Sequence, residues 1–188
     1  TETLDTIQMR YKKTLNRPKC AINGYFDQYK TPLKRGIDTV DFILLTLWTR
    51  LPSVEEFAIQ NGINDYAQIL YNKHRLVPQI INDVFEETSH LSKKSVIKSD
   101  AEKIVVVTHH LPTFAAIEDR HKGNVLNASY ATELGNFITD SHITAWIYGH
   151  SHHSSDLMIG NTHLVSNPLG HVFCGENINF YDSAVIEV

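Results

Sequence analysis

Three histidines stand directly after apolar segments that have the length of buried strands. His109 follows residues 104–107 in the phrase VVVTHHLP, and His150 and His152 follow residues 143–148 in the phrase WIYGHSHH. Catalytic groups of open α/β sheets gather outside the carboxyl ends of the strands. Two parallel strands would therefore deliver these imidazoles to one edge of a sheet, where imidazole nitrogens can bind a metal ion such as manganese, iron or zinc.

The spacing of His150 and His152 favours two neighbouring metal ions. Side chains two residues apart in a turning loop can diverge, and Gly149 lets the backbone bend without a side chain in the way. A single histidine after a strand is usually a polar loop residue, but a GHxH after one apolar strand and a THH after another form a specific pattern. We therefore interpret His109, His150 and His152 as metal-binding and catalytic residues. The adjacent His110 and His153 either contact the substrate or line the rim.

The segments around these histidines are typical of an α/β unit. Apolar, β-branched runs predict strands over 104–108 and 143–148, with a helix over 127–139 between them. The order strand–helix–strand indicates parallel pairing. Elsewhere we expect helices over 3–15 and 76–91, strands over 40–48 and 183–188, and a hairpin of 156–159 with 162–166 around Gly160-Asn161. The fold class is α/β, and residues 1–188 form a single domain.

The composition excludes several classes of protein. An apolar fraction of 42% and a charged fraction of 20% are those of an ordinary soluble globular protein. No stretch approaches the ~20 consecutive apolar residues of a membrane helix, so no membrane partner is expected. A net charge of -4 without a basic run disfavours nucleic acid as the main partner. Cys20 and Cys174 form no CxxC pair, which favours a reducing compartment and a cytoplasmic location.

Several phrases resemble one known family. VVVTHHLP, WIYGHSHH and HLVSNPLGH resemble the last two signature blocks and the tail of calcineurin-like metallophosphoesterases. TLWT at 46–49 and NDY at 64–66 resemble the middle of bacterial cytoplasmic members, predicted phosphohydrolases. The resemblance runs from residue 40 or so to the C-terminus and is strongest after Lys103. It implies part of a four-layer α/β/β/α sandwich, in which His109 and His150 share one ion while His152 holds its neighbour.

The family pattern also has upstream blocks that this sequence lacks: Asp-x-His, Gly-Asp, and Gly-Asn-His followed by Asp or Glu. The letters Asp140-Ser141-His142 precede a predicted strand instead of following one, and Gly160-Asn161-Thr162-His163 lies in the predicted hairpin. We interpret both as coincidences. The expectation is that an N-terminal segment with these strands and motifs is missing, so that this chain is the C-terminal portion of such a domain. A divergent, inactive relative is the alternative.

The activity implied by the resemblance is hydrolysis of a phosphomonoester or phosphodiester substrate. Two divalent ions (Mn, Fe or Zn) in the complete protein would clamp the phosphate oxygens and activate a water. This chain alone would retain one ion or none and would be inactive, because two close cations repel without a bridging carboxylate. Half of a sandwich would expose apolar strands, so we also expect association through them.

Two other interpretations stay open. In the first alternative, the chain is a non-catalytic scaffold or interaction domain with the same fold. In the second, it is a mononuclear zinc hydrolase in which His109, His150 and His152 bind one ion. Outside the histidines, Asn167 in SNPLGH either shapes the loop beneath the metals or approaches the substrate. The pair Asp65-Tyr66 either lines the substrate cleft or serves as a helix cap and a packed ring.

Overall fold

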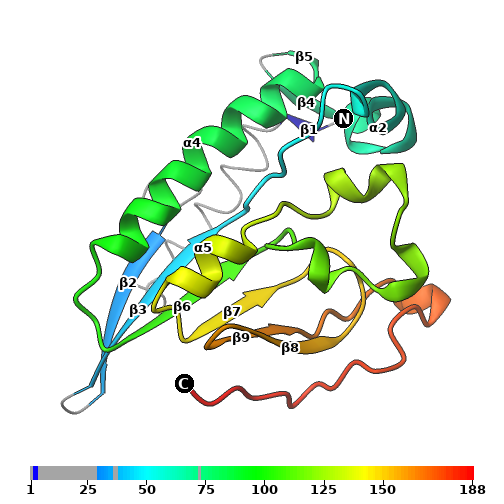
Figure 1. Ribbon diagram of the computed structural model, residues 1–188. Coiled ribbons are helices and arrows are strands. Elements are labelled where there is room, and N and C mark those ends of the chain that lie inside the picture. Colours follow the sequence, from blue (N-terminus) through cyan, green and yellow to red (C-terminus); the bar gives the residue numbers. More distant parts are fainter. Residues whose placement is uncertain (1, 4–28, 36–37, 72) are drawn as a thin grey trace.

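A six-stranded sheet organises the computed structural model, which describes residues 2–3, 29–35, 38–71 and 73–188 (Figure 1). Its strand order is β2-β3-β6-β7-β9-β8. The strands are β2 (Tyr29–Arg35), β3 (Asp38–Leu45), β6 (Lys103–Thr108), β7 (Ala145–Tyr148), β8 (Ser155–Ile159) and β9 (Thr162–Ser166). The four central strands are mutually parallel, and β2 and β8 pair antiparallel at the two edges. The chain is therefore of the mixed α/β class, as the sequence predicts.

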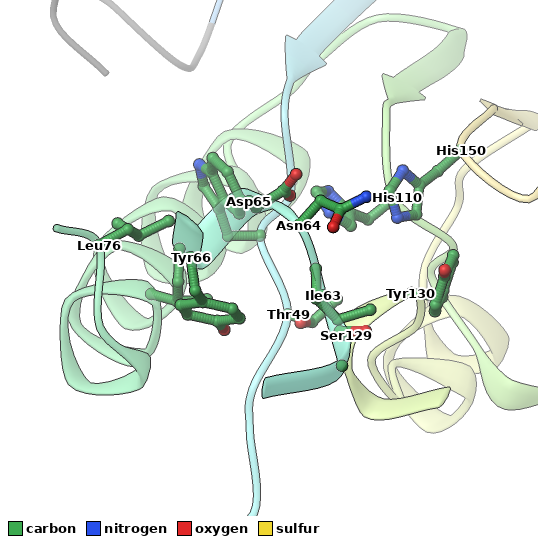
Figure 2. Close-up of a pocket in the computed structure, with 13 residues that line it drawn as sticks. Thr49, Ile63, Asn64, Asp65, Tyr66, Leu76, His110, Ser129, Tyr130 and His150 are labelled. Carbon is green, nitrogen blue, oxygen red and sulfur yellow. The ribbon is translucent and has the colours of Figure 1, made fainter. Parts of the chain in front are cut away.

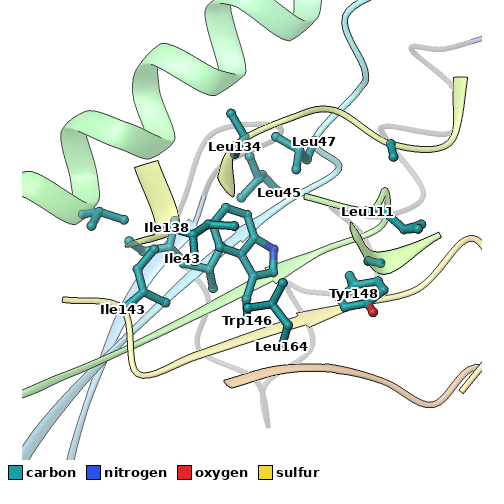
Figure 3. Packing of buried hydrophobic residues seen from close by; sticks show 14 of the residues in the cluster. Ile43, Leu45, Leu47, Leu111, Leu134, Ile138, Ile143, Trp146, Tyr148 and Leu164 are labelled. Atoms are coloured by element: carbon teal, nitrogen blue, oxygen red, sulfur yellow. The ribbon is translucent and has the colours of Figure 1, made fainter. Parts of the chain in front are cut away.

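The main hydrophobic core lies on one face of this sheet. Alternate strand residues point to the same side, so Ile43 of β3 and the almost fully buried Trp146 of β7 face the same core (Figure 3). Helices α4 (Pro78–Ile97) and α5 (Gly135–Asp140) both pack on that face. Their contributions to the core are Phe85, Val96 and Ile138.

Helix α4 runs six residues beyond the predicted end at Leu91. Pro78 occupies its first turn, where a missing N–H costs nothing. The polar residues near its end do not break it, because their hydroxyls bond to carbonyls one turn earlier. Thr88 Oγ1 donates to the carbonyl of Val84 at 2.8 Å, and Ser92 Oγ donates to that of Ser89 at 2.9 Å.

A smaller unit stands beside the sheet at the end of β3. It comprises α2 (Glu56–Gly62), α3 (Asp65–Gln68), and a small sheet of β1 (Glu2–Thr3), β4 (Ile69–Tyr71) and β5 (His74–Arg75). It has a core of its own, and Trp48 packs against both this cluster and the main one. The buried members of the smaller cluster are Leu51, Ile59, Tyr66, Leu76, Ile81 and Ala128.

The helix predicted over 127–139 is confirmed from Gly135 onward and is wrong before it. The chain forms a 3₁₀ turn, η3 (Val125–Ser129), then an extended stretch, and α5 begins only at Gly135. The cause is pairing with a distant segment: the Leu111 N–H donates to the carbonyl of Tyr130, and the Thr132 N–H donates to that of Leu111, each at 3.1 Å. These bonds hold the backbone open where a helix would close it.

The final strand predicted over 183–188 is also wrong. Those residues are irregular, and Val185 is 91% exposed. The hairpin prediction is confirmed, with Gly160 supplying a positive φ of 58° at the turn. The strand expected over 40–48 ends at Leu45 because Leu47 adopts φ 51°. The remaining short 3₁₀ turns are η1 (Phe114–Ala116), η2 (Asp119–His121) and η4 (Val172–Cys174).

Two expectations from the sequence concern residues 4–28, which lie outside the residues that the structure describes. Of the helix expected over 3–15, only Thr3 is described, in β1, and Cys20 also lies among the residues left out. Within the described ranges, none of the helices combines the length and the apolar character that crossing a membrane requires.

Candidate metal centre at the strand ends

The carboxyl ends of the four parallel strands meet along one edge of the sheet. Trp48 lies three residues beyond the end of β3, His109 follows β6, His150 follows β7 and Asn167 follows β9. This edge is where open α/β sheets place their ligands. Four separate loops therefore contribute side chains to one rim.

Backbone hydrogen bonds tie the first three of these loops together. The carbonyl of Thr46 accepts from the N–H groups of His109 and His110, at 3.1 and 3.2 Å. The carbonyl of His109 in turn accepts from the N–H of Gly149 at 3.1 Å. The positions of the imidazoles are thus set by main-chain bonds between neighbouring strands.

His109 and His150, here called the rim pair, meet at their ring nitrogens. His150 Nδ1 lies 2.9 Å from His109 Nε2, with ring centroids 4.7 Å apart and planes at 68°. Two nitrogens bound to one tetrahedral ion at ~2.0–2.1 Å are about 3.3 Å apart. A shift of a few tenths of an ångström would therefore let both imidazoles bind one ion, so the donor set fits a divalent metal.

The loop after β7 has an uncommon backbone. His150 has φ 64°, and the Ser151 N–H donates to the Gly149 carbonyl at 2.8 Å, which forms a γ-turn centred on His150. His152 is also left-handed, with φ 52°. Left-handed residues other than glycine are uncommon and cluster at functional sites.

The role expected for Gly149 is therefore wrong. Glycine is not needed at this position, because an added Cβ would meet the His109 carbonyl oxygen at an ordinary 3.7 Å. The positive φ values that turn the loop belong to His150 and His152.

The surroundings of the rim pair favour neutral imidazoles. Burial, and then the charges of His109 and His152, lower the pKa of His150 from 6.5 to about 3. His109 is exposed on one side, but its ring lies against His110 and His150. Burial by these neighbours, followed by the charge of His152, lowers its pKa as well. Neutral imidazole is the form that binds metal ions.

His110 forms part of the wall beneath the rim pair. Its side chain is 3% exposed, its ring packs on Trp48 with centroids 5.3 Å apart, and burial holds its pKa well below the usual value. Its carbonyl accepts from Thr108 Oγ1 at 2.8 Å, and that hydroxyl accepts from the Trp146 indole at 3.0 Å. The core thereby fixes the loop that carries the rim pair.

His152 turns away from the rim pair and joins two residues of the C-terminal segment. We call His152, His171 and Glu176 the tail cluster. Their possible ligand atoms all lie within 4.8 Å of one another, and His152 Nδ1 is 2.9 Å from Glu176 Oε2. The Glu176 carboxylate also accepts from the His171 N–H at 2.9 Å, and this bond is the main reason that its pKa is lowered.

Within the described part of the chain, the tail cluster is the sole group of three or more His, Cys, Asp or Glu side chains with metal-ligand spacing. The arrangement in which His109, His150 and His152 together bind one zinc ion is therefore not formed. Sequence analysis missed His171 and Glu176, although HLVSNPLGH contains the first. No fixed spacing connects them to His152, because they lie on an irregular segment.

His153 and Asn167 have structural contacts. His153 Nδ1 lies 3.8 Å from a carboxylate oxygen of Glu118. Asn167 Nδ2 donates to the Tyr181 carbonyl at 2.7 Å, and its Oδ1 accepts from the Tyr181 N–H at 3.1 Å and from Ser154 Oγ at 3.3 Å. Asn167 thus fastens the C-terminal segment beside the rim.

A cavity of about 230 Å³ adjoins the rim pair (Figure 2). The side chains of Asn64 and Asp65 point into it toward His110 and His150. The Tyr130 ring lies against His150 with centroids 4.8 Å apart. Burial raises the pKa of the Asp65 carboxyl group. The residues that line the cavity are Trp48, Thr49, Gly62, Ile63, Asn64, Asp65, Tyr66, Leu76, Ile81, His110, Ser129, Tyr130 and His150.

Fold and site together define an α/β protein with a candidate histidine metal centre at the carboxyl ends of its parallel strands. The sequence matches no family model. It is similar to an uncharacterized protein, L509, of Acanthamoeba polyphaga mimivirus, with 25% identity over 201 residues that span 93% of this chain and 69% of the viral protein. That name assigns no activity, so the function must be argued from the geometry of the site.

Proposed function

We propose that the protein is a metal-dependent phosphoesterase that hydrolyses phosphomonoesters or phosphodiesters. The observation that carries this proposal is the rim pair: two neutral imidazoles whose nitrogens lie 2.9 Å apart at the ends of adjacent parallel strands. A divalent ion held there would polarise a phosphoryl oxygen and lower the pKa of a bound water toward neutrality. Manganese, iron and zinc all suit imidazole ligands.

The cavity beside the rim pair would receive the leaving group of the ester. Its rings, from Trp48 and Tyr130, suit an apolar or aromatic alcohol. When the water-derived oxygen bonds to phosphorus, the ester P–O bond breaks and its electron pair stays on the leaving oxygen. Asp65 would supply the proton for that oxygen, since burial favours the protonated form of its carboxyl group.

In the dinuclear version of this site, His152 would hold a second ion beside the rim pair. His152 has diverged from His150 as that version requires, and its nitrogen faces the Glu176 carboxylate. The charge of His152 contributes to lowering the pKa of both members of the rim pair.

We also propose that the sheet is half of an α/β/β/α sandwich. Helices α4 and α5 cover one face, and the other face carries apolar residues that are only half-buried, a surface suited to a second sheet. This face would also be the place of association with another chain. The half-buried apolar residues are Phe42, Leu44, Val107, Ile147 and Val165. The exposed free thiol of Cys174 fits the cytoplasmic location that we propose.

The test is metal binding and hydrolysis by variants of the rim pair. The 188-residue chain and the product of its full reading frame are assayed with manganese and an aryl phosphodiester, in wild-type form and with His150→Ala or His109→Ala. We expect both substitutions to abolish turnover, and Asp65→Asn to lower kcat without changing metal binding at the rim pair. His142→Ala, at an exposed histidine, is the matched control. Hydrolysis that survives both rim substitutions would refute the proposal.

One observation favours the non-catalytic alternative, a scaffold or interaction domain. In the ranges that the structure describes, no carboxylate joins His109 and His150 in a group of three ligand atoms. A scaffold would bind no metal at the rim pair, so neither the chain nor the product of its full reading frame would show turnover, and His109→Ala and His150→Ala would leave the number of bound ions unchanged.

A further inference from the structure

We propose that the tail cluster, His152, His171 and Glu176, is a metal site in its own right, which takes a zinc-class divalent ion and fastens the C-terminal segment to the loop after β7. The proposal goes beyond the proposed function, because it gives the ion at His152 two further ligands, His171 and Glu176, that the dinuclear version does not use. It concerns two residues that the rim pair does not use, and it holds whether or not the protein hydrolyses an ester.

The donor set is that of a zinc site. Two imidazoles and one carboxylate offer ligand atoms that all lie within 4.8 Å of one another. Three protein ligands of this kind, with water in the fourth position, are typical of tetrahedral zinc. The 2.9 Å between His152 Nδ1 and Glu176 Oε2 is close to the ~3.3 Å expected for two ligands of one such ion.

The backbone holds the ligands on both sides of the cluster. His152 adopts a left-handed conformation with φ 52°, in the loop that follows β7. On the other side, the left-handed Gly175, with φ 58°, follows the turn η4 and brings Glu176 back toward His171. The His171 N–H then donates to the Glu176 carboxylate at 2.9 Å, which orients that carboxylate as an outer hydrogen bond orients a metal ligand.

A bare ion pair explains this arrangement less well. The contact between His152 and Glu176 needs no third residue, yet the His171 ring stands perpendicular to the His152 ring with centroids 4.7 Å apart. The three side chains are also accessible, so an ion can enter. A shared ion gives each of the three a role.

Such an ion would act as a cross-link. The loop after β7 and the segment after β9 are joined near Ser154 and Asn167 by hydrogen bonds, but η4 and its neighbours are exposed. A metal bridging His152 to His171 and Glu176 would close a loop of some twenty residues and restrict the C-terminal segment.

Zinc titration by calorimetry, with cobalt(II) absorption as a probe of tetrahedral geometry, tests the proposal. We compare wild-type protein with His171→Ala, Glu176→Gln and the rim variant His150→Ala. We expect His171→Ala to bind one ion fewer than wild type, and Glu176→Gln to bind that ion at least about 10-fold more weakly. Since both side chains are exposed, the variants should fold, which a thermal melt checks.

Limited proteolysis gives a second readout. Zinc should slow cleavage within residues 168–181 in wild-type protein and in His150→Ala, but not in His171→Ala. The proposal is overturned if His171→Ala binds as many ions as wild type with the same affinity, or if zinc leaves cleavage unchanged, which would mean an ion pair only. Binding that survives His150→Ala and is lost in His171→Ala would support the tail site even if the rim pair proved inactive.

Discussion

The rim pair and the tail cluster are both built from histidines, but different parts of the molecule position them. His109 and His150 follow buried strands, and the Trp146 indole and the Thr46 carbonyl fix their loops. The tail cluster takes two of its three side chains from an irregular, exposed segment. The rim pair is preorganised by the hydrophobic core, whereas the tail cluster depends on a few polar contacts.

The largest expected difference between the two regions is in their coupling to global stability. Trp146→Ala should lower the free energy of unfolding by ~3–5 kcal/mol, because it empties a site that is 1% exposed and removes a buried hydrogen bond. His171→Ala, at an exposed position, should change it by less than about 0.5 kcal/mol. Urea denaturation followed by circular dichroism measures both. Similar values for the two variants would contradict the contrast.

The rim pair should make the stability of the folded protein depend on pH. The pKa of His150 is about 3 in the folded protein and 6.5 when unperturbed, so between these values the unfolded chain binds a proton that the folded chain does not. The contribution of His150 to the free energy of unfolding is complete above its unperturbed pKa of 6.5 and is lost as the pH falls toward its folded pKa of about 3. Between these two values the loss approaches ~1.4 kcal/mol per pH unit. We expect the free energy of unfolding of metal-free His150→Asn to change less between about pH 7 and pH 5 than that of the wild-type protein. Parallel curves for variant and wild type would refute this assignment.

A smaller difference in stability between the two regions should come from the left-handed backbone at His150. Asparagine tolerates a left-handed φ and a β-branched residue does not, so His150→Val should be about 1–2 kcal/mol less stable than His150→Asn. At His171, where φ is −79°, the same pair of substitutions should differ by less than about 0.5 kcal/mol. Thermal melts of the four variants provide the comparison, and equal differences at both positions would count against strain in the loop after β7.

The smallest expected effect is local to the tail. Asn167→Ala removes two hydrogen bonds to the backbone of Tyr181 and should loosen the C-terminal segment by about 1 kcal/mol. The amide of Tyr181 should exchange with solvent several-fold faster, while the amides of β6 keep their protection. Faster exchange in both places would show that the tail and the core unfold together.

Sequence pattern was sufficient for the part of the fold that the core determines. Apolar, β-branched runs identified β6 and β7, and the order of elements predicted their parallel pairing. The turn at Gly160-Asn161 identified the hairpin of β8 and β9, but the parallel pairing of β9 with β7 was not predicted. The helix expected over 127–139 failed before Gly135 because the backbone of Leu111, a distant residue, pairs with Ala131. Local periodicity carries no information on such a partner.

In the candidate site, too, sequence pattern could place some of the residues and not others. His109 and His150 could be placed together because strand ends of a parallel sheet share an edge. His171 and Glu176 could not, since their positions follow from the contacts of Asn167 with Tyr181 and from the turn at Gly175. Those contacts connect residues by side chains across an irregular segment, for which the sequence has no periodic signal.

The position of Trp48 restricts how the cavity can change in evolution. One indole packs against both hydrophobic clusters and also forms a wall of the cavity beside the rim pair. A mutation there that reshapes the cavity for a different ligand would at the same time loosen two packed regions, so adaptation through this residue is constrained. Asn64, Asp65 and Tyr130 line the same cavity outside the buried clusters. Divergence in ligand preference would therefore proceed through Asn64 and Tyr130 while Trp48 stays unchanged.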